Sequence, residues 1–124
     1  MINTRITLTM IVIFAVAINT KAQKEADPSQ IAAYQTKTMI ATLDLQDKQV
    51  DSIKAINQKY AQTITQILLK ESNFFGRMKS IRKNNNLKNE ELEKVLSKKQ
   101  MEKYKDEVQP AIRKYIKQQR KVQH

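Results

Sequence analysis

The chain has 124 residues, with 23 lysines and arginines against 12 aspartates and glutamates, and a formal net charge of +11. It contains one glycine, two prolines, one histidine and no cysteine. So few glycines and prolines leave little material for tight hairpin turns, which argues against an all-β fold. Without cysteine there is no disulfide, so stability must come from helix packing or association. We therefore expect one small all-α domain.

The first 22 residues are organised like a cleavable signal peptide. Arg5 supplies a positive start, Ile6 to Ile18 is an apolar run of 13 residues, and the polar stretch after it ends in Ala22. Thirteen residues are short for a bilayer span, which takes roughly 20. Cleavage would export residues 23–124 as a single helical domain with no stable membrane insertion. An uncleaved N-terminal anchor is the alternative.

Positive charge is concentrated in the second half of this domain. Residues 23–69 hold five basic and five acidic residues, whereas residues 70–124 hold sixteen basic and seven acidic ones. An acidic partner would therefore be met by the second half. The last basic run comprises Arg113, Lys114, Lys117, Arg120 and Lys121. We interpret it as a solvated helix face, and since export disfavours the alternative of nucleic-acid binding, we expect no nucleic acid among the partners.

The first predicted helix runs from Pro28 to Leu43. Asp27 can cap it, Pro28 suits its first position, and Gln30 follows as the third residue. Its apolar stripe, at steps of three and four, comprises Ile31, Tyr34, Thr38 and Ala41, flanked by Met39 and Leu43.

The second predicted helix starts near Asp47 and carries the strongest periodic signal in the chain. Its stripe comprises Val50, Ile53, Ile56, Tyr60, Ile64, Ile67 and Leu68. Four later apolar residues prolong the stripe, namely Phe74, Phe75, Met78 and Ile81. This pattern predicts a helix that runs on to Lys83, with Gly76 as a weak point costing about 1 kcal/mol relative to alanine. Whether the helix is continuous through Gly76 stays open.

A turn is predicted at Asn84 to Asn86, because asparagine tolerates left-handed backbone. A short helix over 87–95 should follow, with Leu87, Leu92 and Val95 or Leu96 facing inward. The last helix is predicted over 98–122, where Pro110 should cause a kink or a split near Gln109. Its inward residues are Met101, Tyr104, Val108, Ala111, Ile112, Tyr115 and Ile116.

Two of these helix starts share one design. Ser97 and Gln100 have the spacing of a capping box, in which each side chain bonds the other residue's main-chain N–H. Fifty-one residues earlier, Gln46 and Gln49 form a looser version, and apolar residues follow both copies at the same offsets. We interpret the pair as a degenerate internal repeat with an architectural role. The motif residues are Leu45, Gln49, Leu96, Ser97 and Gln100.

The residue types exclude most catalytic chemistry. The single histidine is His124, which leaves no His/carboxylate metal cluster and no Ser-His-Asp or Cys-His nucleophile. Gly76 is the single glycine, so there is no glycine-rich phosphate loop. Glu90 and Glu91 are better explained by charge complementarity at the start of a short helix than by acid–base catalysis. We expect no enzyme, no metal and no cofactor.

The aromatic cluster around Phe74 and Phe75 has two interpretations. It can close the core of a long helical hairpin, as large apolar residues usually do. It can instead be an apolar patch with a basic rim that holds unfolded segments. The candidate client-binding residues under the second interpretation are Phe74, Phe75, Arg77, Met78, Lys79, Arg82 and Lys83.

The two Leu-x-x-x-Gln stretches, Leu45 to Gln49 and Leu96 to Gln100, resemble the paired LTxxQ motifs of the Spy/CpxP family of periplasmic helical proteins. The second copy has Ser97 in place of threonine, and the first departs further with Gln46 at that position. The similarity covers the chain from about Met39 to Tyr104. It implies an elongated four-helix hairpin, commonly a cradle-shaped homodimer, that acts without ATP. Zinc-binding relatives use histidines that this chain lacks.

Our hypothesis is a periplasmic, ATP-independent chaperone of the holdase type, with unfolded or misfolded envelope proteins as partners. The alternative is an envelope-stress signalling adaptor that docks on a sensor protein.

Overall fold

A computed structural model describes residues 27–121. The predicted signal peptide and His124 lie outside the described residues. In chain order the elements are α1 (Pro28–Leu43), α2 (Asp47–Lys70), α3 (Phe74–Glu93), α4 (Lys98–Lys103), the π-helical turn η1 (Tyr104–Val108) and α5 (Gln109–Lys121). Because α4, η1 and α5 are continuous, residues 27–121 form four helices and no strand, which confirms the all-α prediction.

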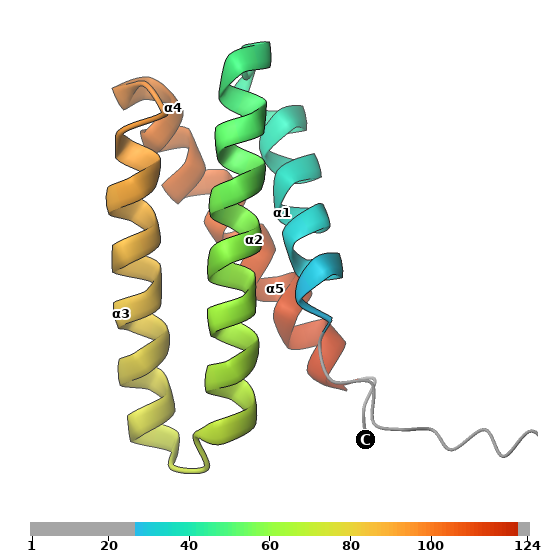
Figure 1. The fold of residues 1–124 in the computed structure, drawn as a ribbon, viewed down its shortest axis with the longest axis vertical. Helices are drawn as coiled ribbons and strands as arrows, with labels where there is room; N and C mark the ends of the chain where they lie inside the picture. The colour runs from blue at the N-terminus through green and yellow to red at the C-terminus, as the bar shows by residue number, and fades with distance from the viewer. Residues whose placement is uncertain (1–26, 122–124) are drawn as a thin grey trace, which may run out of the picture.

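The molecule is an elongated helical hairpin with its connections at two ends (Figure 1). The α1–α2 and α3–α4 connections lie at one end, and the α2–α3 turn lies at the other (Figure 1). The segment from α4 to α5 crosses behind α2 (Figure 1). The 24 residues of α2 span about 36 Å at about 1.5 Å per residue, so the two ends are well separated.

Helix α1 begins and ends where the sequence predicts. Asp27 Oδ1 accepts from the Ser29 main-chain N–H at 2.9 Å, and Asp44 ends the helix in left-handed backbone with φ 53°. The buried stripe differs from the predicted one. It follows steps of four through Ile31, Gln35, Met39 and Leu43, whereas Ala41 is exposed. The polar Gln35 hid this register from a search for apolar periodicity.

The predicted helix over 47–83 is wrong. Helix α2 ends at Lys70, and α3 begins at Phe74 after a three-residue turn. The turn is stabilised by Asn73, whose Oδ1 accepts from the Phe75 N–H at 2.9 Å and from the Gly76 N–H at 3.5 Å. This asparagine N-cap starts a new helix although the apolar pattern continues through it.

The turn predicted at Asn84 to Asn86 is also wrong. These residues lie in the middle of α3, and the predicted helix over 87–95 is its last part, ending at Glu93. The buried positions of this half are Asn84, Lys88 and Leu92, at steps of four, and Leu87 points outward with 43% exposed.

Two smaller expectations about the last two helices change as well. Glu90 and Glu91 lie near the end of α3 instead of at a helix start, and Glu91 Oε1 pairs with Lys59 Nζ of α2 at 3.0 Å. The irregularity expected near Gln109 is a π-helical turn, in which the Gln109 N–H reaches the Tyr104 carbonyl. This wider turn accommodates Pro110, which cannot donate a hydrogen bond.

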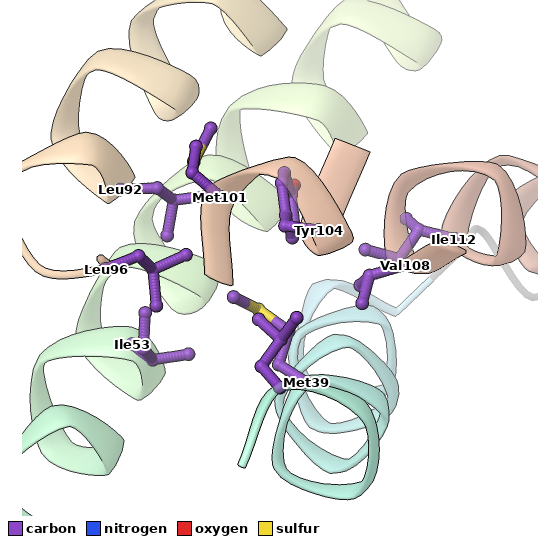
Figure 2. Packing of buried hydrophobic residues seen from close by; sticks show 9 residues of the cluster. Met39, Ile53, Leu92, Leu96, Met101, Tyr104, Val108 and Ile112 are labelled. Carbon is purple, nitrogen blue, oxygen red and sulfur yellow. The ribbon is translucent and has the colours of Figure 1, made fainter. Parts of the chain in front are cut away.

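One apolar cluster joins all four helices. Figure 2 shows Met39, Ile53, Leu92 and Val108, one from each helix, pointing into it. Its other buried members are Leu43, Leu96, Met101, Tyr104 and Ile112. Burying each such side chain is worth about 1.5–3 kcal/mol. The stripe predicted for the last helix is confirmed as a core face at Met101, Tyr104, Val108 and Ile112, and the stripe predicted for α2 is confirmed at Ile53, Tyr60 and Ile64.

The helical position of Asn86 gives a test with a definite sign. Asn86 is exposed within α3. In a helix interior alanine is more favourable than glycine by about 1 kcal/mol, whereas a left-handed turn favours glycine. We expect Asn86→Ala to be more stable than Asn86→Gly by about 1 kcal/mol in urea denaturation. Equal stability, or a more stable glycine variant, would instead support the turn predicted from the sequence at Asn84 to Asn86.

Candidate functional site

The predicted capping box at Ser97 is present. Ser97 Oγ accepts from the Gln100 main-chain N–H at 3.1 Å, and Gln100 Oε1 accepts from the Ser97 N–H at 2.9 Å. The earlier copy keeps the glutamine half of this arrangement, because Gln49 Oε1 accepts from the Gln46 N–H at 2.9 Å. Both glutamines therefore stabilise the start of their own helices.

The two glutamines also bind each other. Gln49 Nε2 donates to Gln100 Oε1 at 2.9 Å, and Gln100 Nε2 donates to Gln49 Oε1 at 3.2 Å. The remaining N–H of each amide donates to a main-chain carbonyl of the other repeat. Gln49 donates to the Val95 carbonyl at 2.9 Å, and Gln100 donates to the Leu43 carbonyl at 3.2 Å.

We call this arrangement the glutamine pair. Each amide uses both of its donors and both acceptor positions of its oxygen. The pair ties the ends of α1 and α3 to the starts of α2 and α4. Leu96 is buried in the apolar cluster that joins the four helices, and Leu45 packs against that cluster. The architectural role predicted for the repeat thus has a specific geometry.

At the opposite end of the bundle, the α2–α3 turn exposes large apolar side chains. Phe74 is 65% exposed and Phe75 is 81% exposed, and their rings meet edge to face with centroids 5.6 Å apart. Met78, one turn further on, is 43% exposed. The interpretation that these residues close the core is wrong. We call Phe74, Phe75 and Met78 the hairpin tip.

The four basic candidates near the tip divide into two kinds. Arg77 serves the turn itself, because its Nε and Nη2 donate to the Glu71 carbonyl at 3.0 and 2.6 Å. Lys79, Arg82 and Lys83 are exposed along α3, and none of them pairs with a carboxylate in the described part of the chain. These three remain available to an acidic partner.

Between α2, α3 and the last helix lies a groove of about 510 Å³. Its apolar walls comprise Ile64, Leu68, Phe74, Met78, Ile81, Ile112 and Ile116. Its polar lining residues include Gln35, Asn84, Lys88, Arg113 and Lys117, and none of the described lining residues is acidic. The tip residues Phe74 and Met78 thus belong to both surfaces.

Lys88 is the most unusual residue of this groove. It is only 4% exposed, its Nζ donates to Gln35 Oε1 at 3.0 Å, and it lies 6.0 Å from the Tyr104 ring centroid. Burial lowers the pKa of Lys88 to about 7, since removing an ammonium group from water disfavours its charged form. Burial also raises the pKa of Tyr104. No carboxylate among the described residues balances the Lys88 charge.

Asn84 adds a second buried polar group. Its Nδ2 reaches the Tyr60 carbonyl over 3.5 Å, and its Oδ1 accepts no hydrogen bond from the described residues. Sequence reasoning missed Lys88, Gln35 and Asn84 because it treated polar residues as solvent-facing. Asn84, Lys88 and Leu92 follow one another at steps of four, and this helical spacing was the signal of a buried face available in the sequence.

Two kinds of site can be assessed within residues 27–121. That part of the chain holds no group of three or more His, Cys, Asp or Glu side chains placed to bind a metal ion. Among its helices, none combines the length and apolar character needed to cross a bilayer.

The fold and its surfaces define an all-helical protein whose repeat glutamines close one end while the other end exposes aromatic residues. A family model described as a domain of unknown function, DUF4890, matches residues 16–104, so the chain belongs to that family. Comparison with curated proteins and comparison with solved structures each find no match.

The glutamine pair can be tested by a double-mutant cycle. Removing one amide leaves donors and acceptors of the other unpaired, so Gln49→Ala and Gln100→Ala should each cost about 1–3 kcal/mol of unfolding free energy. The double variant should cost clearly less than the two single costs added together, because the partners are lost at once. Urea denaturation measures all three.

Gln62→Ala is the matched control for this cycle, since Gln62 is exposed on α2 and should change stability by less than about 0.5 kcal/mol. Additive single costs would show that the two amides act independently.

The lowered pKa of Lys88 predicts a pH-dependent stability. From about pH 7 up to the ordinary lysine value near 10.4, the unfolded chain holds one proton more at this group than the folded protein does. The contribution of Lys88 to unfolding free energy therefore rises with pH in this window, by up to about 1.4 kcal/mol per unit. Below the window the full cost of burying the charge is present.

We expect Lys88→Met, which keeps an unbranched chain, to be more stable than the wild type below about pH 7 and to lose that advantage towards about pH 10. Urea denaturation across this range provides the measurement, with Lys114→Met on the exposed face of α5 as control. A stability difference that stays constant with pH would contradict the lowered pKa.

Proposed function

We propose that the protein is an exported, ATP-independent chaperone of the holdase type that binds unfolded or aggregation-prone proteins of the cell envelope. The observation that carries the proposal is the pair of adjacent phenylalanines at the hairpin tip, exposed by 65% and 81%. Large apolar residues gathered at one exposed place mark interaction sites. Unfolded chains offer complementary apolar segments.

The charge around the tip supports capture of such chains. Lys79, Arg82 and Lys83 follow the tip along α3 without partner carboxylates among the described residues. Positive charge raises the rate at which acidic or mixed-charge segments arrive, and apolar contact then holds them. Capture should therefore weaken with salt only to the extent that steering dominates.

The arrangement of the fold supports the same proposal. The tip lies at the opposite end from the glutamine pair, so a client can bind there without disturbing the residues that close the bundle (Figure 1). The N-terminal segment organised like a signal peptide supports export, and the resemblance to the Spy/CpxP family supports periplasmic chaperone activity. That resemblance also implies a homodimer.

A signalling adaptor is the second candidate function. Two aromatic side chains in the first turn of one helix are the kind of compact anchor that fills a pocket on a single partner. Under this alternative the tip would dock on one sensor protein instead of many unfolded clients.

The tip can be tested by removing its aromatic surface. We expect the double variant Phe74→Ser/Phe75→Ser to lose most of the wild-type ability to suppress light scattering by several chemically different unfolded proteins at stoichiometric ratio. The two residues contribute little to the core, so unfolding free energy should change by less than about 1 kcal/mol. Ile40→Ser, which removes an exposed apolar residue from α1, is the control.

Mass in solution should be measured on the same samples, because loss of a dimer could also reduce activity. No suppression by the wild type with any client would reject the holdase proposal. Tight one-to-one binding to a single sensor protein, without protection of clients, would favour the adaptor instead.

A further inference from the structure

We propose that the groove between α2, α3 and the last helix binds a fatty acid, with the carboxylate at Lys88 and the acyl chain directed towards the hairpin tip. The inference rests on the groove and not on the proposed chaperone function. The apolar chain and the single negative charge of this ligand match the two kinds of lining that the groove offers.

The lining changes in character along α3. Phe74, Met78 and Ile81 line the groove near the tip, and Asn84 and Lys88 line it further along the helix. From Phe74 to Lys88 the helix rises about 21 Å. Helix α2 follows the same order, because Leu68 lies near the tip while Tyr60 meets Asn84. Along α2 and α3 the lining thus passes from apolar residues at the tip to polar residues at Lys88.

The polar end is suited to an anion. The Lys88 ammonium is buried, has one hydrogen-bond acceptor in Gln35 Oε1, and has no carboxylate partner in the described part of the chain. An ammonium group has three donors, so two remain for a ligand. A buried charge without a partner is costly, and a bound carboxylate would supply the missing opposite charge.

Neighbouring groups reinforce this preference. Arg113 also lines the groove, and its charge acts on Tyr104, whose ring lies 6.0 Å from Lys88 Nζ. Asn84 is held by one long hydrogen bond to the Tyr60 carbonyl, 3.5 Å, so its amide can turn its Nδ2 towards an anion. The groups facing Lys88 are the neutral Gln35 and Tyr104, and no acidic residue lines the groove to repel an anion.

The size of the groove also fits one acyl chain. Its volume of about 510 Å³ lies within the range of about 300–1,000 Å³ that is usual for small-molecule sites. An unfolded peptide would use the exposed tip and would have little need of a buried lysine. A fatty acid uses both the apolar walls and the charge.

The test is calorimetric titration of the full-length mature protein with dodecanoate below its micelle concentration, near pH 6.5, where Lys88 carries its proton. We expect saturable one-to-one binding. Lys88→Met should weaken it by about 10- to 100-fold, the value of charge-assisted hydrogen bonds. Arg113→Gln should weaken it less, and Lys114→Gln, on the neighbouring position outside the groove, should leave it unchanged.

Three further ligands separate charge from apolar contact. Decanoate, shorter by two methylenes, should bind about tenfold more weakly. The affinities of dodecanol for the wild type and for Lys88→Met should agree within about twofold. Dodecyltrimethylammonium should bind the wild type more weakly than dodecanoate or dodecanol does. Lys88→Met is checked for a cooperative urea transition at least as stable as that of the wild type, so that weak binding is not mistaken for unfolding.

Equal dodecanoate affinity in wild type and Lys88→Met would overturn the proposal, as would the absence of saturable binding by the wild type. Client protection is measured separately, because Lys88→Met leaves every residue of the hairpin tip in place. Loss of fatty-acid binding with intact protection would show that client capture at the tip is separable from binding at the charged end of the groove. Parallel loss of both by Lys88→Met would refute that separation.

Discussion

The reciprocal hydrogen bonds between the Gln49 and Gln100 amides are the constraint on which the arrangement of this bundle depends. Each glutamine also closes its own helix start and reaches a carbonyl at the end of a helix in the other repeat. A shorter or charged side chain at either position could not make all four contacts. The same glutamine therefore recurs in both copies of the repeat, because its amide joins the α1–α2 connection to the α3–α4 connection.

This constraint makes the two ends of the molecule different. At the glutamine pair, side chains join segments that are 51 residues apart, and the large apolar cluster packs beside them. At the hairpin tip, Asn73 and Arg77 make only local hydrogen bonds within the turn. The closed end supplies stability, so the other end can expose aromatic rings without loss of the fold.

Sequence reasoning predicted the helical class, the bounds of α1, the Ser97 capping box and the core faces of α2 and the last helix. These features depend on local capping chemistry or on apolar periodicity, and both are visible in one chain. It failed along α3, where polar residues occupy the buried positions. Asn84 and Lys88 broke the apolar pattern, and three consecutive asparagines imitated a turn. The contact between Gln49 and Gln100 depends on tertiary packing, which spacing alone does not determine.

Lys88, whose burial was not predicted from the sequence, is also a residue whose burial costs free energy of folding. A lysine buried without a carboxylate lowers stability at neutral and acidic pH, and an apolar residue at the same position would pack at no such cost. Residues that violate the rules of burial tend to lie at functional sites. Lys88 stands at the polar end of an otherwise apolar groove, so a use for its charge is the simplest explanation for its burial.

The groove and the hairpin tip meet at Phe74 and Met78, which line the groove and are also exposed at the tip, Phe74 the more so. An acyl chain that reaches this ring would cover part of the surface proposed for clients. Two ligands that share one side chain oppose each other, and the factor by which the first weakens the second equals the factor by which the second weakens the first. Bound fatty acid would then reduce client capture in proportion to its occupancy. The shared ring therefore couples the two proposed sites, although different residues give each its chemistry.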